Sequence, residues 1–321
     1  MPLSLRIDPW TPDYESAIRF EDGPDDDPPV DTSVETDDWR PIRPSESVSF
    51  PETIFFIDGV RRIDVGVIQE EDQKLVFGIL GSYAAGVSEY RSGSGTIGET
   101  RIRRRIVLGA GIHHDPIDIE AGSAVLHYEG HGTPENDRQH VVDAIQVLMR
   151  TLEGELAKSL TGDDGLTFVD GPLTYLLPLE EPIVGYVKTH TRYYLTSEHM
   201  RTVSALEPGT RSPVFAFGES SASRYSWYLR LAQPRAIDHS LAGIVRLEVS
   251  HSVGADNAVR LADTSSAALP RFASTSAWDP RAPQNLYPIS ALEESLRHLL
   301  GDREWIRRHI EAHIHREGVA A

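Results

Sequence analysis

The chain has no cysteine among its 321 residues. Disulfide bonds, thiolate zinc sites and a cysteine nucleophile are therefore excluded. Long apolar runs are also missing, since no stretch approaches the ~18 apolar residues of a membrane span. The N-terminus lacks the basic-then-apolar pattern of a secretory signal. We therefore expect a cytoplasmic protein that does not enter a membrane.

Lysine is scarce, and Lys74, Lys158 and Lys188 are the only examples. The formal net charge is -18, which is the wrong sign for a protein that binds nucleic acid through its phosphates. Such a partner would require a local basic groove, a metal ion that bridges the phosphate, or a second protein that delivers the strand. An acidic adaptor that docks on a basic partner surface is the non-enzymatic alternative.

Several catalytic motifs are absent too. The chain has no P-loop, no GxGxxG and no GxSxG, so nucleotide hydrolysis by a Walker site and serine hydrolase chemistry have no support. Two histidine pairs, His127 with His131 and His309 with His313, lack an HExxH motif and a third ligand. Neither pair is sufficient to indicate zinc.

The composition, with 40% hydrophobic and 25% charged residues, is typical of a globular protein with a substantial core. Residues 1–50 are acidic and rich in proline, and we interpret them as a mobile or loosely docked arm. Residues 51–321 are predicted to form one domain that includes two C-terminal helices.

The pattern of elements predicts an α/β fold. Apolar runs indicate antiparallel strands at 54–57, 63–68 and 75–80, while the Gly/Ser-rich residues 81–100 are expected to form a mobile loop. A long amphipathic helix is predicted from Thr133 to Gly162, and a strand follows it. Three antiparallel strands, then a helix and a strand, open the ribonuclease-H-like fold. We therefore expect a mixed sheet flanked by helices, with a helical tail. The remaining predicted elements are strands at 101–108, 123–128, 166–170, 183–188, 214–217, 225–231 and 244–249, and helices at 197–203, 255–261, 288–300 and 303–316.

Two of the predicted strands end in Asp-Gly, at Asp58 and at Asp170. If these strands are neighbours in one sheet, both aspartates leave the core at the same rim. The alternative is that Asp-Gly simply forms a hairpin turn. That alternative is serious for Asp58, because residues 60–67 could pair back. It is weaker for Asp170, because Pro172 would disturb the returning strand.

The long helix carries two acids, Glu153 and Glu155, that could reach over this rim. Helical spacing puts them on opposite sides of the apolar face, and solvated surface positions are the alternative for both. Arg150 lies three residues before Glu153 and could orient it or bind phosphate. Three converging carboxylates are typical of sites for Mg²⁺ or Mn²⁺. This combination points to metal-assisted phosphodiester chemistry, with a small-substrate phosphohydrolase as a second enzymatic reading.

Basic residues on two strands are further candidates. Lys188 ends the predicted strand at 183–188 and could stabilise charge on a phosphate, or simply face solvent. Arg101, Arg103 and Arg105 alternate along one strand face. They could track a nucleic-acid backbone or protect an edge strand.

Together these segments resemble the NurA nuclease family in its bacterial form. The matching stretches occur in the family's order and cover roughly residues 50–300. They are Phe56-Ile57-Asp58-Gly59-Val60-Arg61-Arg62, Met149-Arg150-Thr151-Leu152-Glu153, Phe168-Val169-Asp170-Gly171-Pro172-Leu173, Gly185-Tyr186-Val187-Lys188-Thr189-His190, and the segment from Asp279-Pro280-Arg281 through Gln284-Asn285-Leu286-Tyr287-Pro288-Ile289.

The resemblance implies a ribonuclease-H-like core and a Mn²⁺-dependent (or Mg²⁺-dependent) nuclease. The expected activities are 5′–3′ exonuclease action on DNA ends and endonuclease action on single strands. It also implies a homodimer that docks on a HerA-type hexameric ATPase, which would deliver the DNA. On this match Asp58, Glu153 and Asp170 are the metal ligands, Lys188 faces the substrate phosphate, and Tyr287 lies near the site.

Two points stay open at this stage. Archaeal relatives have a histidine shortly after the tyrosine, whereas this chain has Ala291 and Leu292, and Asp279 or Gln284 could take its place. The apolar stripe of the C-terminal helices could form the dimer surface or pack on the chain's own sheet. Its members are Leu292, Leu296, Leu299, Leu300, Trp305, Ile306, Ile310 and Ile314.

Overall fold

The computed structural model describes residues 5–7, 28–71, 74–160, 165–177, 179–190, 192–235, 237–275, 277, 279 and 281–320. Most of the acidic stretch of the predicted arm, residues 8–27, lies outside this range. Within it, no helix combines the length and the apolar character needed to cross a membrane.

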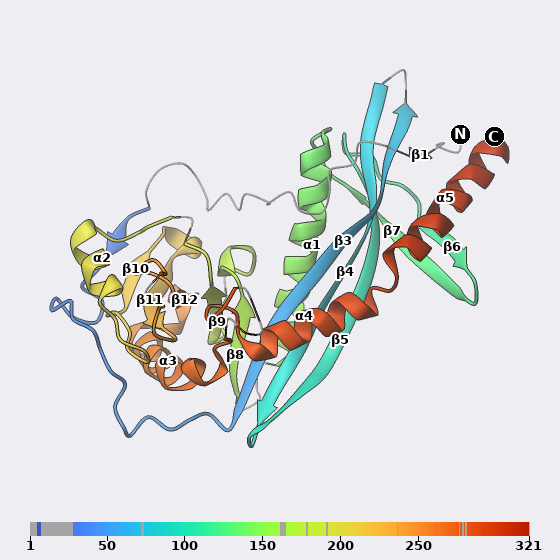
Figure 1. Cartoon of the computed structure of the whole chain (residues 1–321). Helices are drawn as coiled ribbons and strands as arrows, with labels where there is room; N and C mark the ends of the chain where they lie inside the picture. The colour runs from blue at the N-terminus through green and yellow to red at the C-terminus, as the bar shows by residue number, and fades with distance from the viewer. Residues whose placement is uncertain are drawn as a thin grey trace.

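The described residues form a mixed α/β structure, as predicted (Figure 1). The strands are β1 (Leu5–Ile7), β2 (Val30–Asp31), β3 (Thr53–Glu71), β4 (Lys74–Arg91), β5 (Ser94–Leu108), β6 (Ile117–Ala121), β7 (Ala124–Gly132), β8 (Gly165–Asp170), β9 (Ile183–Val187), β10 (Phe215–Phe217), β11 (Arg224–Arg230) and β12 (Ile244–Ser250). The helices are α1 (Arg138–Ser159), α2 (Ser197–Ser204), α3 (Ala255–Ala268), α4 (Tyr287–Leu299) and α5 (Arg303–Ala320), with short 3₁₀ turns at Leu173–Tyr175, Ser220–Ala222, His251–Val253 and Leu269–Phe272.

The sheet has the order β2-β10-β11-β12-β9-β8-β3-β4-β5-β7-β6 across the described strands, with β1 added beside β3. Its centre is β5-β4-β3-β8-β9. The first three of these strands are antiparallel, and β8 and β9 continue parallel to β3. This arrangement confirms the predicted mixed sheet. The long helix α1 follows the antiparallel strands and leads into β8, which returns beside β3.

The strands around the first Asp-Gly are much longer than the sequence indicated. β3 runs without a break through Asp58 and Gly59 to Glu71, with one register shift between Ile63 and Val65, so the hairpin alternative at Asp58 is wrong. The predicted mobile loop at 81–100 is also wrong, because β4 and β5 occupy it.

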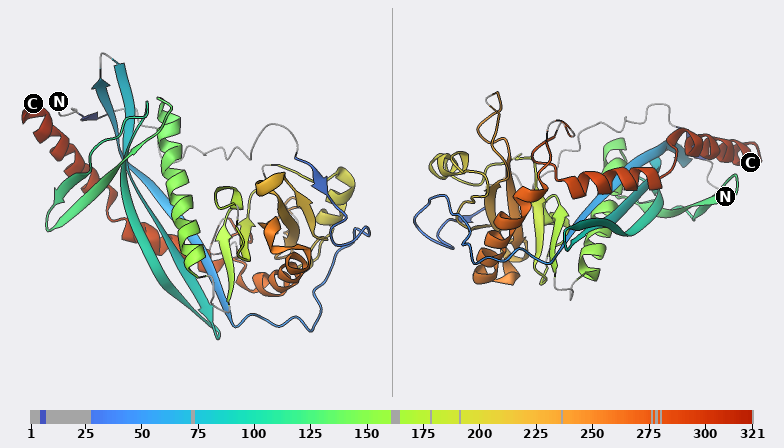
Figure 2. Two further views of the ribbon diagram at one scale, coloured as in Figure 1. Left: turned by 180° about the vertical axis from the view of Figure 1, so that it is seen from behind. Right: turned by 60° about the horizontal axis from the view of Figure 1, so that its bottom comes forward.

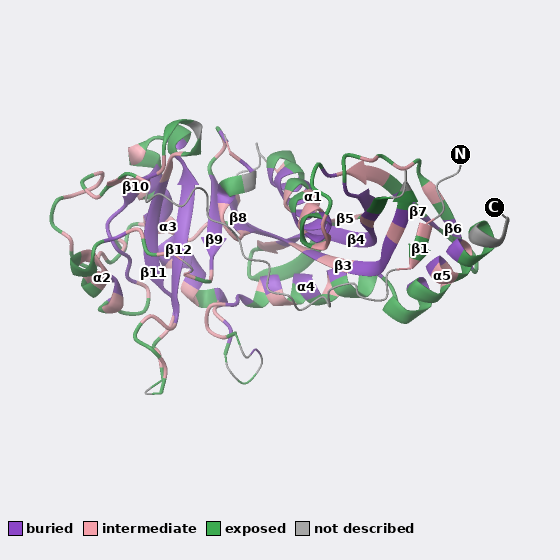
Figure 3. Ribbon diagram, turned by 90° about the horizontal axis from the view of Figure 1, so that it is seen from above, coloured by how far each residue is buried: buried purple, intermediate pink, exposed green. Residues whose placement is uncertain are grey.

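Glycines in β4 mark close helix packing rather than mobility. A Cβ on Gly81 would lie 3.1 Å from Ile145 of α1, and one on Gly86 would lie 3.0 Å from Leu292 of α4. Figure 3 shows α1 and α4 on opposite faces of β3 and β4. The two helices therefore sandwich these strands.

Helix α1 begins later than predicted. The backbone N–H of Thr133 donates to the carbonyl of Leu108, which continues the pairing of β7 with β5. The helix starts instead at Asp137, whose side chain accepts hydrogen bonds from the backbone N–H groups of Gln139 and His140. The N-cap is an aspartate rather than the predicted threonine.

The apolar stripe of the C-terminal helices packs on the chain's own sheet. Leu292, Leu296 and Leu300 join a core cluster with Val60 and Ala84. The α5 isoleucines at 306, 310 and 314 join a second cluster with β6 and β7. Leu299 and Trp305 remain exposed.

The part of the predicted arm that the structure describes contacts the half of the sheet that contains β9–β12. It runs around that half before entering β3 (Figure 2). β2 pairs with β10, and the carboxylate of Glu35 forms two hydrogen bonds, of 2.7 and 2.8 Å, with the buried guanidinium of Arg211. The division into an arm at 1–50 and a domain at 51–321 stays a prediction.

Candidate active site

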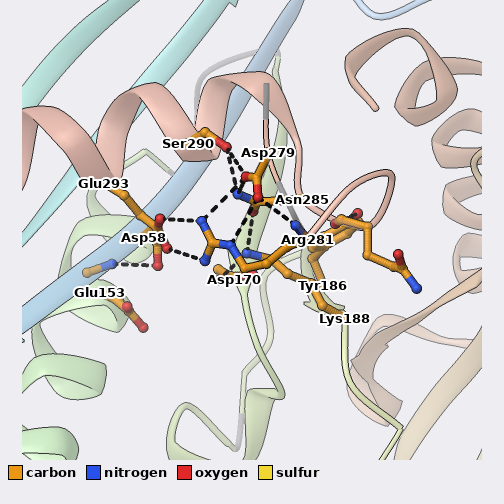
Figure 4. A network of polar contacts seen from close by, with 12 residues as sticks. Asp58, Glu153, Asp170, Tyr186, Lys188, Asp279, Arg281, Asn285, Ser290 and Glu293 are labelled. Atoms are coloured by element: carbon orange, nitrogen blue, oxygen red, sulfur yellow. Dashed lines mark hydrogen bonds and ion pairs between the residues drawn. The ribbon is translucent and has the colours of Figure 1, made fainter. Parts of the chain in front are cut away.

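Asp58 and Asp170 lie where two parallel strands diverge. β3 and β8 pair as far as Ile57 and Val169, and each aspartate is the next residue on its strand. Asp170 still pairs with Tyr186 of β9, whereas β3 continues beside β4 and is joined by β1 only from Val67 onward. Both aspartates therefore flank the fork between β3 and β8 (Figure 4), but Asp58 is buried within a continuing strand and does not leave the core at a rim, contrary to the expectation from the sequence.

Glu153 reaches this fork from the face covered by α1. Its side chain is fully buried, and a Cβ on Gly59 would lie only 2.7 Å from Glu153 Oε1. Glycine at this position is thus what lets the carboxylate approach the strand. Glu155 points elsewhere: its side chain is 58% exposed and lies 3.8 Å from Arg101. Of the two helix acids, the structure brings Glu153 to the aspartates.

Two cations of the chain face these acids. Arg150 Nη1 lies 2.7 Å from Glu153 Oε2 and also donates to the carbonyl of Asp170. Gly171, at φ +95°, leaves the space that the Arg150 guanidinium fills. Lys188 Nζ lies 2.8 Å from Asp170 Oδ2. Lys188 is thus part of the site, and Arg150 orients Glu153 as the sequence suggested.

Burial and the repulsion between neighbouring carboxylates shift the pKa values of these acids. Burial, followed by the charges of Asp170, Glu153 and Glu293, raises the pKa of Asp58 well above its ordinary value, although Lys188 opposes this. Burial also raises the pKa of Glu153 to about 7, despite Arg150. Burial acts to lower the pKa of Lys188, but Asp170 and Asp58 raise it on balance. These buried acids need additional positive charge to ionise together.

Two buried carboxylate oxygens have no hydrogen-bond partner among the residues that the structure describes. They are Asp58 Oδ2 and Glu153 Oε1, whereas Asp58 Oδ1 accepts the backbone N–H of Gly59 at 2.8 Å. Unpaired buried oxygens are costly unless something binds them. Hard oxygen donors with raised pKa values fit a divalent cation of the Mg²⁺ or Mn²⁺ class.

The site is not preassembled around an ion. Among the described residues, no three histidine, aspartate or glutamate side chains are grouped so that they could hold a metal as they stand. Asp170 and Glu153 each direct one oxygen to Lys188 and Arg150 instead. These ammonium and guanidinium groups supply the positive charge present at the fork.

The C-terminal motif meets the site through Asn285, a residue that the sequence reasoning did not single out. Its side chain is fully buried, and Asn285 Oδ1 accepts a hydrogen bond from Lys188 Nζ at 2.8 Å. Its amide nitrogen donates to Asp279 at 2.5 Å and to Ser290 at 2.6 Å. Asn285 thus fixes Lys188. A buried amide inside a turn-rich segment gives no sequence signal that separates it from an ordinary turn residue.

The predicted tyrosine lies farther out. Tyr287 is 42% exposed, and its hydroxyl is 3.3 Å from Thr275 rather than beside the acids. Tyr186 is the buried tyrosine of the site, and its hydroxyl donates to the carbonyl of Gln284 at 2.7 Å. Asp279 contacts Asn285 and Arg281. Glu293, which sequence alone does not distinguish from its neighbour Glu294, also faces the site (Figure 4).

The arginines of β5 lie away from these groups. Arg101 pairs with Glu99 at 2.7 Å, and Arg105 pairs with Glu129. β7 joins β5 only from Arg105 onward, so Arg101 and Arg103 stand on an open edge of the sheet. This observation agrees with the edge-protection alternative.

Comparisons with known proteins identify the family of this chain and the relatives of its fold. The family model of the NurA domain matches residues 52–294. The fold is similar to the crystal structure of the NurA nuclease from Sulfolobus solfataricus, with a TM-score of 0.51, 10% sequence identity, and coverage of 87% of this chain and 88% of that chain. No curated protein sequence matches significantly. The family match extends over most of the chain and includes the three acids and the two cations of the fork. This chain therefore belongs to the NurA family.

Proposed function

We propose that this protein is a metal-dependent deoxyribonuclease. The observation that carries the proposal is the pair of buried, unpartnered oxygens on Asp58 and Glu153, beside Asp170, at the fork of β3 and β8. Membership of the NurA family supports nuclease activity at this place. We assign Asp58, Glu153 and Asp170 as ligands for one or two divalent cations, with Mn²⁺ preferred over Mg²⁺.

The chain's own groups have separate tasks in this proposal. When bound, the metal supplies Lewis acidity and a water of lowered pKa. Arg150 holds Glu153 in place through the 2.7 Å ion pair. Lys188, which stays protonated beside Asp170, neutralises negative charge that develops on the phosphate oxygens. Asn285 directs the ammonium of Lys188, and burial of the fork limits the water that reaches it.

The charge of -18 bears on how DNA reaches such a site. A strongly acidic protein binds DNA weakly by itself, because phosphate neutralisation dominates affinity. We propose that a HerA-type hexameric ATPase delivers the DNA, that the nuclease acts as a homodimer, and that its activities are 5′–3′ degradation from ends and cleavage of single strands. Asp58, Glu153, Asp170 and Lys188 form the catalytic set, with Tyr287 as an outer contact.

The test is cleavage of end-labelled single- and double-stranded DNA over a Mn²⁺ titration, with and without the motor protein. We expect Mn²⁺-dependent products that disappear in Asp58→Asn. Cleavage by Asp58→Asn at saturating Mn²⁺ would contradict the ligand assignment. Hydrolysis of nitrophenyl phosphate without DNA cleavage would indicate a small-substrate phosphohydrolase. Motor binding without Mn²⁺ binding would indicate a non-catalytic adaptor.

A further inference from the structure

Helix α4 lies directly against the strand pair at the level of Asp58. Asp58 of β3 pairs with Gly86 of β4, and directly opposed residues of an antiparallel pair face the same side of the sheet. A Cβ on Gly86 would lie 3.0 Å from Leu292 and 3.2 Å from Leu296. The missing side chain thus lets α4 settle beside the Asp58 carboxylate.

Glu293 is the residue after Leu292, so the packing of Leu292 against Gly86 also positions the Glu293 side chain at the site. Its side chain is only 12% exposed, although it is an acid on a surface helix. Figure 4 shows the Glu293 carboxylate beside Asp58, on the side opposite to Glu153. The electrostatic contributions agree, since Glu293 raises the pKa values of both Asp58 and Lys188.

The partners of Glu293 are half-exposed arginines. Arg281 donates from Nη2 to Glu293 Oε2 at 2.8 Å and from Nη1 to Oε1 at 3.3 Å, and Arg297 Nη2 lies 3.7 Å from Oε2. These arginine side chains are 51% and 58% exposed, so their guanidinium groups already have access to water. A cation that binds Glu293 would have to displace Arg281, whose guanidinium can then turn into solvent.

We propose that Glu293 is a further oxygen ligand of the divalent-cation site, an assignment that rests on the metal-dependent function proposed above. The unpartnered oxygens of Asp58 and Glu153 indicate where a cation would bind. Glu293 approaches this position from the face of the sheet opposite to Glu153. Acids on both sides of β3 then surround one position. In this arrangement the fourth ligand comes from α4. It does not come from Gln284 or from Asp279, whose carboxylate accepts hydrogen bonds from Asn285 and Ser290.

The experiment is calorimetric titration of Mn²⁺ into the full-length, chelator-treated protein, in which no DNA or turnover is involved. We expect Glu293→Gln to weaken Mn²⁺ binding by at least about tenfold. Glu294→Gln, an exposed change at the next position, should bind Mn²⁺ as the wild type does. Glu293→Asp, which withdraws the carboxylate by one methylene, should also bind more weakly, and it preserves the charge if the glutamine variant fails to fold.

The variant Arg281→Met distinguishes two possible roles of Glu293. Glu293 is either a ligand of the cation or only an ion-pair partner that holds Arg281 in place. If Glu293 binds the cation, this variant retains or strengthens Mn²⁺ affinity, because a competing cation is removed. If it weakens binding as Glu293→Gln does, Glu293 serves only to hold Arg281 and the inference is overturned. Unchanged affinity in Glu293→Gln, with the expected loss in Asp58→Asn, would overturn the role of Glu293 alone. No Mn²⁺ binding by the wild type would overturn the proposed function as well.

Discussion

Asp58 and Asp170 are each one residue beyond Ile57 and Val169, the last pair that joins β3 to β8. A sheet that splits between two parallel strands leaves an opening at the split, and these aspartates stand on its two sides. Glu153 enters beside Gly59, from one face of the sheet. The chemistry proposed above depends on this opening, because a continuous sheet would keep the carboxylates of opposite faces apart.

Removing one charge from the fork should stabilise the metal-free protein. Asp58 is buried, and the charges of Asp170 and Glu153 oppose its ionisation. We expect Asp58→Asn to raise the free energy of unfolding by about 1 kcal/mol in the presence of a chelator, while cleavage is lost. Urea unfolding followed by circular dichroism measures the first effect. A variant that is less stable than the wild type would show that the carboxylate is satisfied in the folded protein.

The two helix acids give a matched comparison. Glu153→Gln should reduce DNA cleavage at least about 100-fold, because it removes a charged ligand at the fork. Glu155→Gln changes an exposed side chain on the same helix and should leave cleavage near the wild-type rate. Initial rates at saturating Mn²⁺ decide between them. Equal cleavage rates in the two variants would contradict the assignment of Glu153 as a ligand at the site.

Asn285 should control the rate through Lys188. In Asn285→Ala the ammonium loses its 2.8 Å acceptor, and we expect cleavage to fall about 10- to 100-fold. Mn²⁺ affinity measured by calorimetry should change little, because neither residue is a proposed ligand. Ser290→Ala is the control, since it removes a neighbour of Asn285 and spares the bond to Lys188. A large loss of Mn²⁺ binding in Asn285→Ala would instead indicate collapse of the whole fork.

His190 should make stability fall at acid pH. Burial, assisted by Arg246, lowers the pKa of His190 below its ordinary value of 6.5, although the carbonyl of Ile244 opposes this. Below about pH 6.5 the unfolded chain binds a proton at this position that the folded protein does not, so the free energy of unfolding decreases with falling pH. Above that pH the residue contributes no pH dependence.

The check is urea unfolding between pH 5 and 8. His190→Gln should flatten the decline below pH 6.5, whereas the exposed His315→Gln should follow the wild-type curve. A parallel decline in wild type and His190→Gln would assign the acid sensitivity to other groups.

The segment before β3 should depend on one buried ion pair. Arg211 is 1% exposed and binds Glu35 through two hydrogen bonds and Asp263 through a third. Glu35→Gln should cost about 2–4 kcal/mol and speed proteolysis of this segment. Asp38→Asn breaks a pair with Arg40 whose side chains are 61% and 79% exposed, so stability should hardly change. Limited proteolysis and urea unfolding measure the effects of the two variants. Equal effects of Glu35→Gln and Asp38→Asn would contradict the role of the Glu35–Arg211 ion pair in holding this segment.

Much of the centre of this fold could be predicted from sequence, because apolar runs at 54–57 and 166–170 and the helical repeat of α1 are local signals. The lengths of β4 and β5 could not. Gly81 and Gly86 read as loop residues until the helices that pack on them are known. A glycine can serve a turn or a close contact, and only tertiary structure tells these uses apart.

The same limit applies to the site. Asp58, Asp170 and Glu153 are recognisable because each lies on an element with a clear pattern. Glu293 is not, since Glu294 has the same chemistry and the choice depends on how α4 rotates against Gly86.

The unbroken course of β3 also bears on how the molecule can be divided. One strand of 19 residues contributes to the layer under α1 and α4 and continues to the end that β1 and α5 cover. Asp58 lies within this shared strand, so cutting the chain on either side would take structural support away from it. We expect the two halves of the sheet to lose their structure in a single cooperative transition, and no fragment from one half to retain the acidic cluster intact.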